Sequence, residues 1–187
     1  MEQPELLRFI IEQLEQLAIQ YMVVGSYASS AYGETRFTND IDIVVEMSAD
    51  QLRALIAKLP AQDFYVSEEA ALAALRAKGQ FNVIHPESGN KIDFMVARAD
   101  AWGREQLRNR QRIELLTGLD VFAARPEDII LSKMLYYSEG GSEKHLRDIT
   151  GIFRASGANI DRGYVQRYAQ ELGLLDVWDA VLKRISA

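Results

Sequence analysis

Two short stretches decide the fold of this chain: Val23-Val24-Gly25-Ser26 and, further along, Asp40-Ile41-Asp42-Ile43-Val44-Val45. The first closes an apolar run that stops at glycine, and the second is rich in β-branched residues, so both predict buried strands. Side chains alternate between the two faces of a strand, which puts Asp40 and Asp42 together on one face. Two neighbouring carboxylates repel each other unless a cation lies between them. A hard divalent ion such as Mg²⁺, which combines one or two protein carboxylates with substrate phosphates, suits this pair.

The same residues resemble the signature of the nucleotidyltransferase superfamily, the polymerase-beta-like fold. In that signature an apolar-Gly-Gly/Ser turn is followed, after a spacer, by an Asp-apolar-Asp/Glu-apolar strand. Gly25, Ser26, Asp40 and Asp42 fill these positions, with a long spacer between them. The resemblance implies an α/β (α+β) fold, with a nucleotidyltransferase-like mixed sheet flanked by helices. The alternative is a surface strand with a solvated acidic face, and the depletion of aspartate from strands argues against it.

The resemblance also implies an activity: transfer of a nucleoside monophosphate from a nucleoside triphosphate to an acceptor hydroxyl, with Mg²⁺ or Mn²⁺ bound by the aspartates. The acceptor hydroxyl is left open among an RNA end, a protein and a small molecule such as an aminoglycoside. A second interpretation is an inactive nucleotidyltransferase-like module that binds a nucleotide or a partner chain.

The turn before the aspartates has chemistry that suits phosphate. Gly25 lets the backbone approach a ligand closely, and Ser26 offers a hydroxyl and an amide at the start of a short helix predicted to end near Tyr32. Arg36, in the polar segment that follows, is a candidate for contact with a triphosphate, although a loop arginine is more often only solvated. These three residues are the predicted nucleotide-binding group of the N-terminal half.

Composition limits the classes of protein that the chain can belong to. With 187 residues it suits one mid-sized domain or a small core with a helical appendage. A formal charge of −6 argues against a protein that coats nucleic acid through net charge, and a cysteine count of zero removes disulfides and thiolate metal sites. No apolar run approaches bilayer length and no secretory signal is visible, so a cytoplasmic protein without membrane contact is the expectation.

Asp93 is a third candidate site residue. It lies between Ile92 and Phe94 in a predicted strand over 91–96, the partner of a strand over 81–85. A lone buried carboxylate is costly, and the resemblance implies a third acid on a later strand, which binds metal or acts as general base. The alternative is an edge-strand aspartate that faces water.

The remainder of the chain, from Pro126, has a helical pattern, which predicts a nucleotidyltransferase core over 1–125 and a C-terminal helical subdomain over 126–187. Lys133 falls inside an apolar helical stripe, where a lysine usually has an anionic partner, so it is a candidate for holding the triphosphate. The alternative is that its stem snorkels along the stripe. A loop is predicted over 138–142, and the helix after it carries Asp148 at the border of its stripe, as a partner for Lys133 or a metal-bound water.

Lys133 followed by Arg147-Asp148 resembles the C-terminal motifs of minimal and abortive-infection toxin type nucleotidyltransferases, which implies that these residues face the aspartate cluster. Five arginines also gather between residues 98 and 112. They predict either a basic guide for a nucleotide or RNA end, or an ordinary solvated helix.

Overall fold

The computed structural model describes residues 1–32 and 40–186, which form two compact units. The sheet unit contains residues 1–27 and 40–123, and the helical unit contains residues 28–32 and 124–186. Each unit has its own buried core. The division into domains over 1–125 and 126–187 stays a prediction, because compactness alone does not make a unit an independently folding domain.

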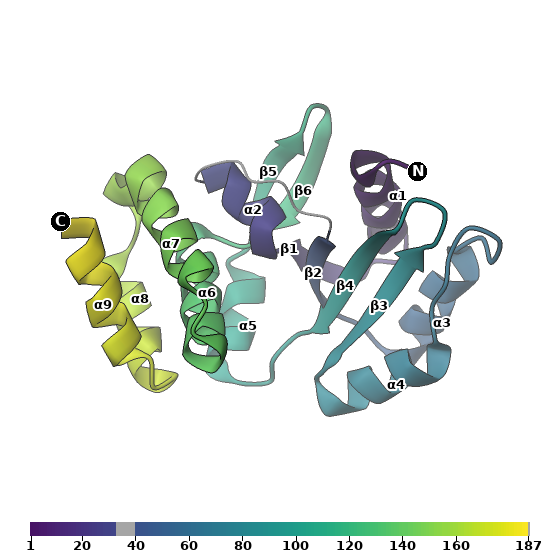
Figure 1. The fold of residues 1–187 in the computed structure, drawn as a ribbon. Helices are drawn as coiled ribbons and strands as arrows, with labels where there is room; N and C mark the ends of the chain where they lie inside the picture. Colours follow the sequence, from purple (N-terminus) through teal and green to yellow (C-terminus); the bar gives the residue numbers. More distant parts are fainter. Residues whose placement is uncertain (33–39, 187) are drawn as a thin grey trace. The chain divides into compact units, whose positions relative to one another are not determined.

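The sheet unit is built on a mixed sheet with the strand order β3-β4-β2-β1-β6-β5 (Figure 1). β2 pairs with β4 and β1 pairs with β6 in parallel, and the remaining neighbours are antiparallel. This arrangement confirms the predicted mixed sheet flanked by helices. The strand bounds are β1 Gln20–Val23, β2 Asp40–Glu46, β3 Gln80–His85, β4 Asn90–Val96, β5 Gln111–Leu116 and β6 Leu119–Ala123.

One face of this sheet is apolar and covered by helices. Ile41, Ile43, Ile92 and Phe94 are fully buried on that face, as their alternation with polar residues predicts. The helices of the sheet unit are α1 Gln3–Gln16, α3 Ala49–Lys58, α4 Glu68–Ala77 and α5 Ala101–Arg108. Aromatic contacts link α1 to the sheet: Phe64 stacks on Phe9 of α1 and contacts His85 of β3 edge-on. The polar residues of β2 and β4 therefore share the opposite face.

α2 (Gly25–Tyr32) begins in the sheet unit, and its residues from Ala28 onward belong to the helical unit. The other helices of that unit are α6 Pro126–Gly140, α7 Glu143–Ser156, the short 3₁₀ helix η1 Gly157–Asn159, α8 Arg162–Glu171 and α9 Leu175–Ser186. Apolar side chains of α6 to α9, including Ile130, Ile149, Tyr168 and Trp178, are buried between them. In the described part of the chain, every helix is too short or too polar to cross a bilayer.

The predicted loop over 138–142 is wrong in most of its length. α6 continues through Ser138 to Gly140, and Gly141 ends it in the left-handed conformation, with its N–H donating to the carbonyl of Tyr137. A serine inside a helix satisfies its hydroxyl locally, and Ser138 Oγ donates to the carbonyl of Leu135. The helix end is therefore set by Gly141 and not by the polar composition before it.

Candidate functional site

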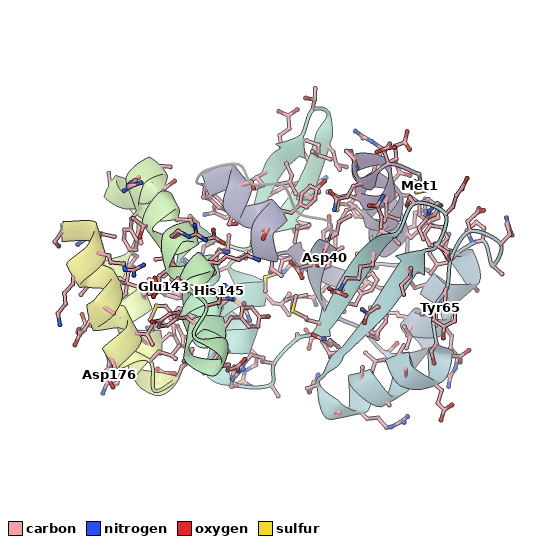
Figure 2. All side chains as sticks on the ribbon, viewed as in Figure 1. Met1, Asp40, Tyr65, Glu143, His145 and Asp176 are labelled. Carbon is pink, nitrogen blue, oxygen red and sulfur yellow. The ribbon has the colours of Figure 1, made fainter. Side chains whose placement is uncertain are left out.

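Three of the predicted site residues lie on one face of the sheet. β2 and β4 are parallel and in register, with Asp42 directly opposite Asp93 and Asp40 directly opposite Lys91. Residues paired in this way point to the same side of a sheet, and residues two apart on one strand do so too. Asp40, Asp42 and Asp93 consequently share the face opposite the covered apolar one. Figure 2 marks Asp40 at the start of β2.

Asp93 is not an edge-strand residue that faces water. β4 lies between β3 and β2, and the Asp93 side chain is 16% exposed. Its Oδ1 atom is buried and has no hydrogen-bond partner among the residues that the structure describes. A buried carboxylate oxygen without a donor is costly, which points to a ligand for this atom.

Gly25 packs directly against Asp42. The glycine has a φ of +65°, and a Cβ built on it would lie 1.9 Å from Asp42 Oδ2. The N–H of Val24 also donates to the carbonyl of Asp42 at 2.9 Å. Position 25 therefore excludes any side chain for two reasons, the left-handed backbone and the aspartate beside it. Ser26, the second residue of α2, is half-buried next to it.

Lys91 is a residue of this face that the sequence reading missed. Its Nζ lies 2.8 Å from Asp93 Oδ2 and 3.6 Å from Asp40 Oδ1. The hydrogen bond to Asp93 raises the pKa of Lys91 against the opposing effect of partial burial, with a smaller contribution from Asp40. The signal in the sequence was the spacing: Lys91 precedes Asp93 by two residues and so had to share its face.

The helical unit brings together the other predicted pair. Lys133 Nζ lies 2.7 Å from Asp148 Oδ2, and their side chains are 6% and 17% exposed. This agrees with the predicted pairing and makes snorkelling of Lys133 into solvent a poor description of the side chain. The convergence of Lys133 and Asp148 with the three aspartates stays a prediction.

A second buried network in the helical unit was missed. Asp128 is fully buried, accepts a hydrogen bond from the Tyr164 hydroxyl at 2.8 Å and lies 3.4 Å from Nε of Arg125. Burial, followed by the charge of Asp128, raises the pKa of Tyr164, so the phenol remains a donor at neutral pH. Hydrophobic periodicity does not reveal that a phenol of α8 reaches Asp128 of α6.

Most of the arginines between residues 98 and 112 contact groups of their own unit. Arg98 pairs with Asp100, Arg112 lies 3.6 Å from Glu15, and the guanidinium groups of Arg110 and Arg112 lie over the Phe122 ring. Arg104 donates to the carbonyl of Ala99. These contacts favour the structural interpretation of the basic stretch over a guide for nucleic acid.

The chain is similar to several solved structures. No protein-family model matches the chain, and no curated protein sequence matches it. The antibiotic-resistance factor ANT(2'')-Ia is similar in its solution structure with a TM-score of 0.62 and 15% identity over 94% of this chain and 96% of that one. Its crystal structure in complex with adenylyl-2''-tobramycin gives a TM-score of 0.61 and 16% identity over 89% of this chain and 96% of that one. The lincosamide antibiotic adenylyltransferase LnuA, bound to lincomycin, gives a TM-score of 0.53 and 15% identity over 81% and 96%.

The chain has the fold of the nucleotidyltransferase superfamily. An antigenic nucleotidyltransferase-like protein from Paracoccidioides brasiliensis agrees, with a TM-score of 0.52 and 20% identity over 94% of this chain and 89% of that one. This confirms the fold that the Gly-Ser and Asp-x-Asp motifs predict. The narrower likeness to the minimal and toxin types stays a prediction.

The nucleotidyltransferase fold implies a divalent ion, and the donor set on the polar face suits one. Carboxylate oxygens are the ligands that Mg²⁺ and Mn²⁺ prefer, and the unpartnered Oδ1 of Asp93 is such an oxygen. Across residues 1–32 and 40–186, however, no three acidic or histidine side chains stand close enough together to hold one ion. The Lys91 Nζ atom lies within ion-pair distance of two of the three aspartates. Arg36, the remaining predicted nucleotide contact, lies outside the described residues.

Proposed function

We propose that the chain is a metal-dependent nucleotidyltransferase that moves a nucleoside monophosphate from a nucleoside triphosphate to an acceptor hydroxyl. The observation that carries the proposal is the register of β2 and β4, which sets Asp42 opposite Asp93 with Asp40 on the same face. The nucleotidyltransferase fold is its second support. Aligned carboxylates on a sheet are costly to stability, so a ligand gives a reason for them that packing does not.

In the proposed reaction the acceptor oxygen attacks the α-phosphorus and pyrophosphate leaves as the bond to its bridging oxygen breaks. Asp40, Asp42 and Asp93 would hold Mg²⁺ or Mn²⁺, which neutralises phosphate charge and aligns the reacting groups. Asp93 would also take the proton of the acceptor hydroxyl, and its Oδ1 atom, which has no hydrogen-bond partner among the described residues, supports this role.

The nucleotide contacts are proposed for both units. The N-terminus of α2 at Gly25 and Ser26 presents backbone N–H groups and a hydroxyl, which suit phosphate oxygens. Lys133, oriented by Asp148, would neutralise the charge on departing pyrophosphate, and Arg36 would contact the triphosphate.

The test is binding first and turnover second. The purified protein is titrated with each nucleoside triphosphate in the presence of Mg²⁺, and again in EDTA. We expect binding that requires the metal and is lost in Asp42→Asn. Failure to bind any of the four triphosphates with Mg²⁺ would falsify the proposal.

Turnover is followed by release of pyrophosphate with a panel of acceptors. The panel contains an aminoglycoside, a lincosamide, a short RNA and a protein mixture, because the similar structures include antibiotic adenylyltransferases. A labelled product with one acceptor class identifies the substrate.

An inactive nucleotide-binding module is the second candidate function. The observation that favours it is the Lys91 ammonium bound to Asp93 and close to Asp40, where an active enzyme needs its metal. Metal-dependent nucleotide binding without pyrophosphate release, across the whole acceptor panel, would support it over the enzyme.

A further inference from the structure

Lys91 occupies a defined position among the acids of the polar face. It is the direct cross-strand partner of Asp40 and precedes Asp93 by two residues on the same strand. Its ammonium group bonds to Asp93 Oδ2 at 2.8 Å and lies 3.6 Å from Asp40 Oδ1. One ammonium group thus joins two of the three carboxylates proposed to hold the metal.

The contact is partly shielded from water. The side chains of Lys91 and Asp93 are 34% and 16% exposed, so this ion pair is stronger than a fully solvated one. A divalent ion that binds Asp93 through both oxygens requires the Oδ2 lone pairs that the ammonium group uses, and one that binds through Oδ1 alone is held close to a second cation on the same carboxylate. The two cations therefore compete for one carboxylate unless Lys91 moves.

We infer that Lys91 is a resident counter-ion of the site, which the incoming divalent cation must displace from Asp93 and Asp40. The inference rests on the proposed function, because it assumes that these aspartates bind the metal. In the metal-free protein Lys91 offsets the repulsion between the aligned carboxylates. When the metal binds, its charge replaces that of Lys91, and the flexible four-carbon stem lets the ammonium group swing out toward solvent.

The competing explanation is a permanent cross-strand ion pair that only stabilises β2 against β4. The two explanations differ in what an arginine at this position does. Arginine keeps the charge and so leaves the long-range field unchanged, but its planar guanidinium forms two parallel bonds to carboxylates and is harder to displace. Glutamine removes the charge and leaves a polar side chain that is one bond shorter.

The experiment measures Mn²⁺ affinity directly, by the loss of the free-ion signal in electron paramagnetic resonance. The proteins are wild type, Lys91→Gln, Lys91→Arg, Asp42→Asn and the control Lys78→Gln. Lys78 is exposed at the end of α4 in the same unit. Lys78→Gln therefore changes the net charge by the same amount as Lys91→Gln. Unfolding in EDTA, followed by circular dichroism, checks that each variant is folded.

We expect Lys91→Gln to tighten Mn²⁺ binding by about tenfold, the factor that loss of one competing charge-assisted hydrogen bond gives. Lys91→Arg should weaken binding relative to wild type, and Lys78→Gln should change it by less than about twofold, since exposed charges are screened. Binding by Lys91→Gln but not by wild type would support the inference most strongly.

Two outcomes overturn it, and they are distinct. If wild type binds Mn²⁺ and Asp42→Asn does not, but both Lys91 variants match wild type, the inference fails while the proposed metal site stands. If none of the proteins binds Mn²⁺, the proposed function fails and the inference with it. Should Lys91→Gln not fold, the comparison of Lys91→Arg with wild type decides between the two explanations.

Discussion

Asp42 on β2 and Asp93 on β4 are direct partners across two parallel strands, with β4 itself covered on its other side by β3. Nothing local to either aspartate requires this, because the strands are separated by α3, α4 and β3 along the chain. The pairing places two carboxylates on one face beside a third, Asp40. It is the relationship on which the proposed chemistry depends.

Replacing one of these carboxylates separates binding from folding. Asp42→Asn should abolish metal-dependent nucleotide binding while the free energy of unfolding stays the same or rises by up to about 1 kcal/mol, since aligned like charges destabilise a sheet. Calorimetry with Mg²⁺ and nucleotide measures the first quantity, and urea unfolding the second. Asp120→Asn is the matched control, because Asp120 lies opposite Glu114 in the β5–β6 hairpin as another aligned acidic pair. A large loss of stability in Asp42→Asn alone would mark that aspartate as structural.

Gly25→Ala should lower stability by more than the cost of its left-handed backbone, because the new methyl group meets Asp42. Gly25→Ala adds the cost of a left-handed alanine, about 1 kcal/mol, and drives Cβ into Asp42 Oδ2. We expect a total loss above about 2 kcal/mol and loss of nucleotide binding. Gly89→Ala controls for the backbone, since Gly89 has a φ of +70° with no atom near a new Cβ. Equal losses in the two variants, with binding intact, would contradict the close contact seen here.

The Lys133–Asp148 pair should behave as a buried ion pair whatever else it does. Lys133→Met removes the ammonium group that lies 2.7 Å from the mostly buried Asp148 carboxylate and should cost about 3 kcal/mol in urea unfolding. The double variant Lys133→Met/Asp148→Leu should regain part of that loss, because it also removes the carboxylate that Lys133 neutralised. Arg184→Met, which breaks an exposed pair with Glu143, should cost less than about 1 kcal/mol. A double variant no more stable than Lys133→Met would show that the two residues are not coupled.

Asp100 gives the sheet unit a contribution to stability that depends on pH. Burial alone would raise its pKa, but hydrogen bonds from Arg98 and the Gly103 N–H together lower it below the usual value. A carboxyl whose pKa falls on folding stabilises the protein above its unfolded pKa, about 3.9, and loses that effect as pH falls through the lower folded value. The free energy of unfolding of wild type should therefore exceed that of Asp100→Asn by about 0.5 kcal/mol at pH 7, and the difference should shrink as pH falls below the unfolded pKa and through the lower folded one.

A second substitution at the same position isolates the helix cap. Asparagine still accepts from the Gly103 N–H, whereas Asp100→Ala loses the cap of α5 and should cost about 1 kcal/mol more at every pH. Urea unfolding at pH 7, 4 and 2.5 measures both differences. A gap between wild type and Asp100→Asn that widens toward low pH would contradict the lowered pKa.

The hydroxyl of Tyr164 should contribute to stability separately from the burial of its ring. Tyr164→Phe removes the donor to the fully buried Asp128 and should cost about 2 kcal/mol, the range for hydrogen bonds to charged groups. Tyr65 is 61% exposed, so Tyr65→Phe should change the free energy of unfolding by less than about 0.5 kcal/mol. Thermal and urea unfolding of the two variants provide the comparison. Identical stabilities would mean that Asp128 does not depend on the Tyr164 hydroxyl.

Errors in the sequence reading came where one residue type supports two structures. The stretch Ser138 to Gly140 has a loop-like composition, yet it completes α6, because the helix ends only where Gly141 adopts a left-handed conformation. Lys91 shares a face with Asp93 through the same period of two that pairs Asp40 with Asp42, so its place beside the carboxylates can be predicted from the sequence.

The amino-acid sequence is enough to predict the strand before Gly25, the strand over Ile41–Val45, the shared face of Asp40 and Asp42, and the helical character of the chain from Pro126. These follow from hydrophobic periodicity, which is local and reports the face on which a side chain lies. Three other features appear only in the folded protein: β4 lies next to β2, Gly25 packs against Asp42, and Lys91 and Tyr164 reach their aspartates. The reason is that periodicity fixes the face of a residue and not its neighbour, which depends on how strands and helices distant in sequence pack to bury apolar surface.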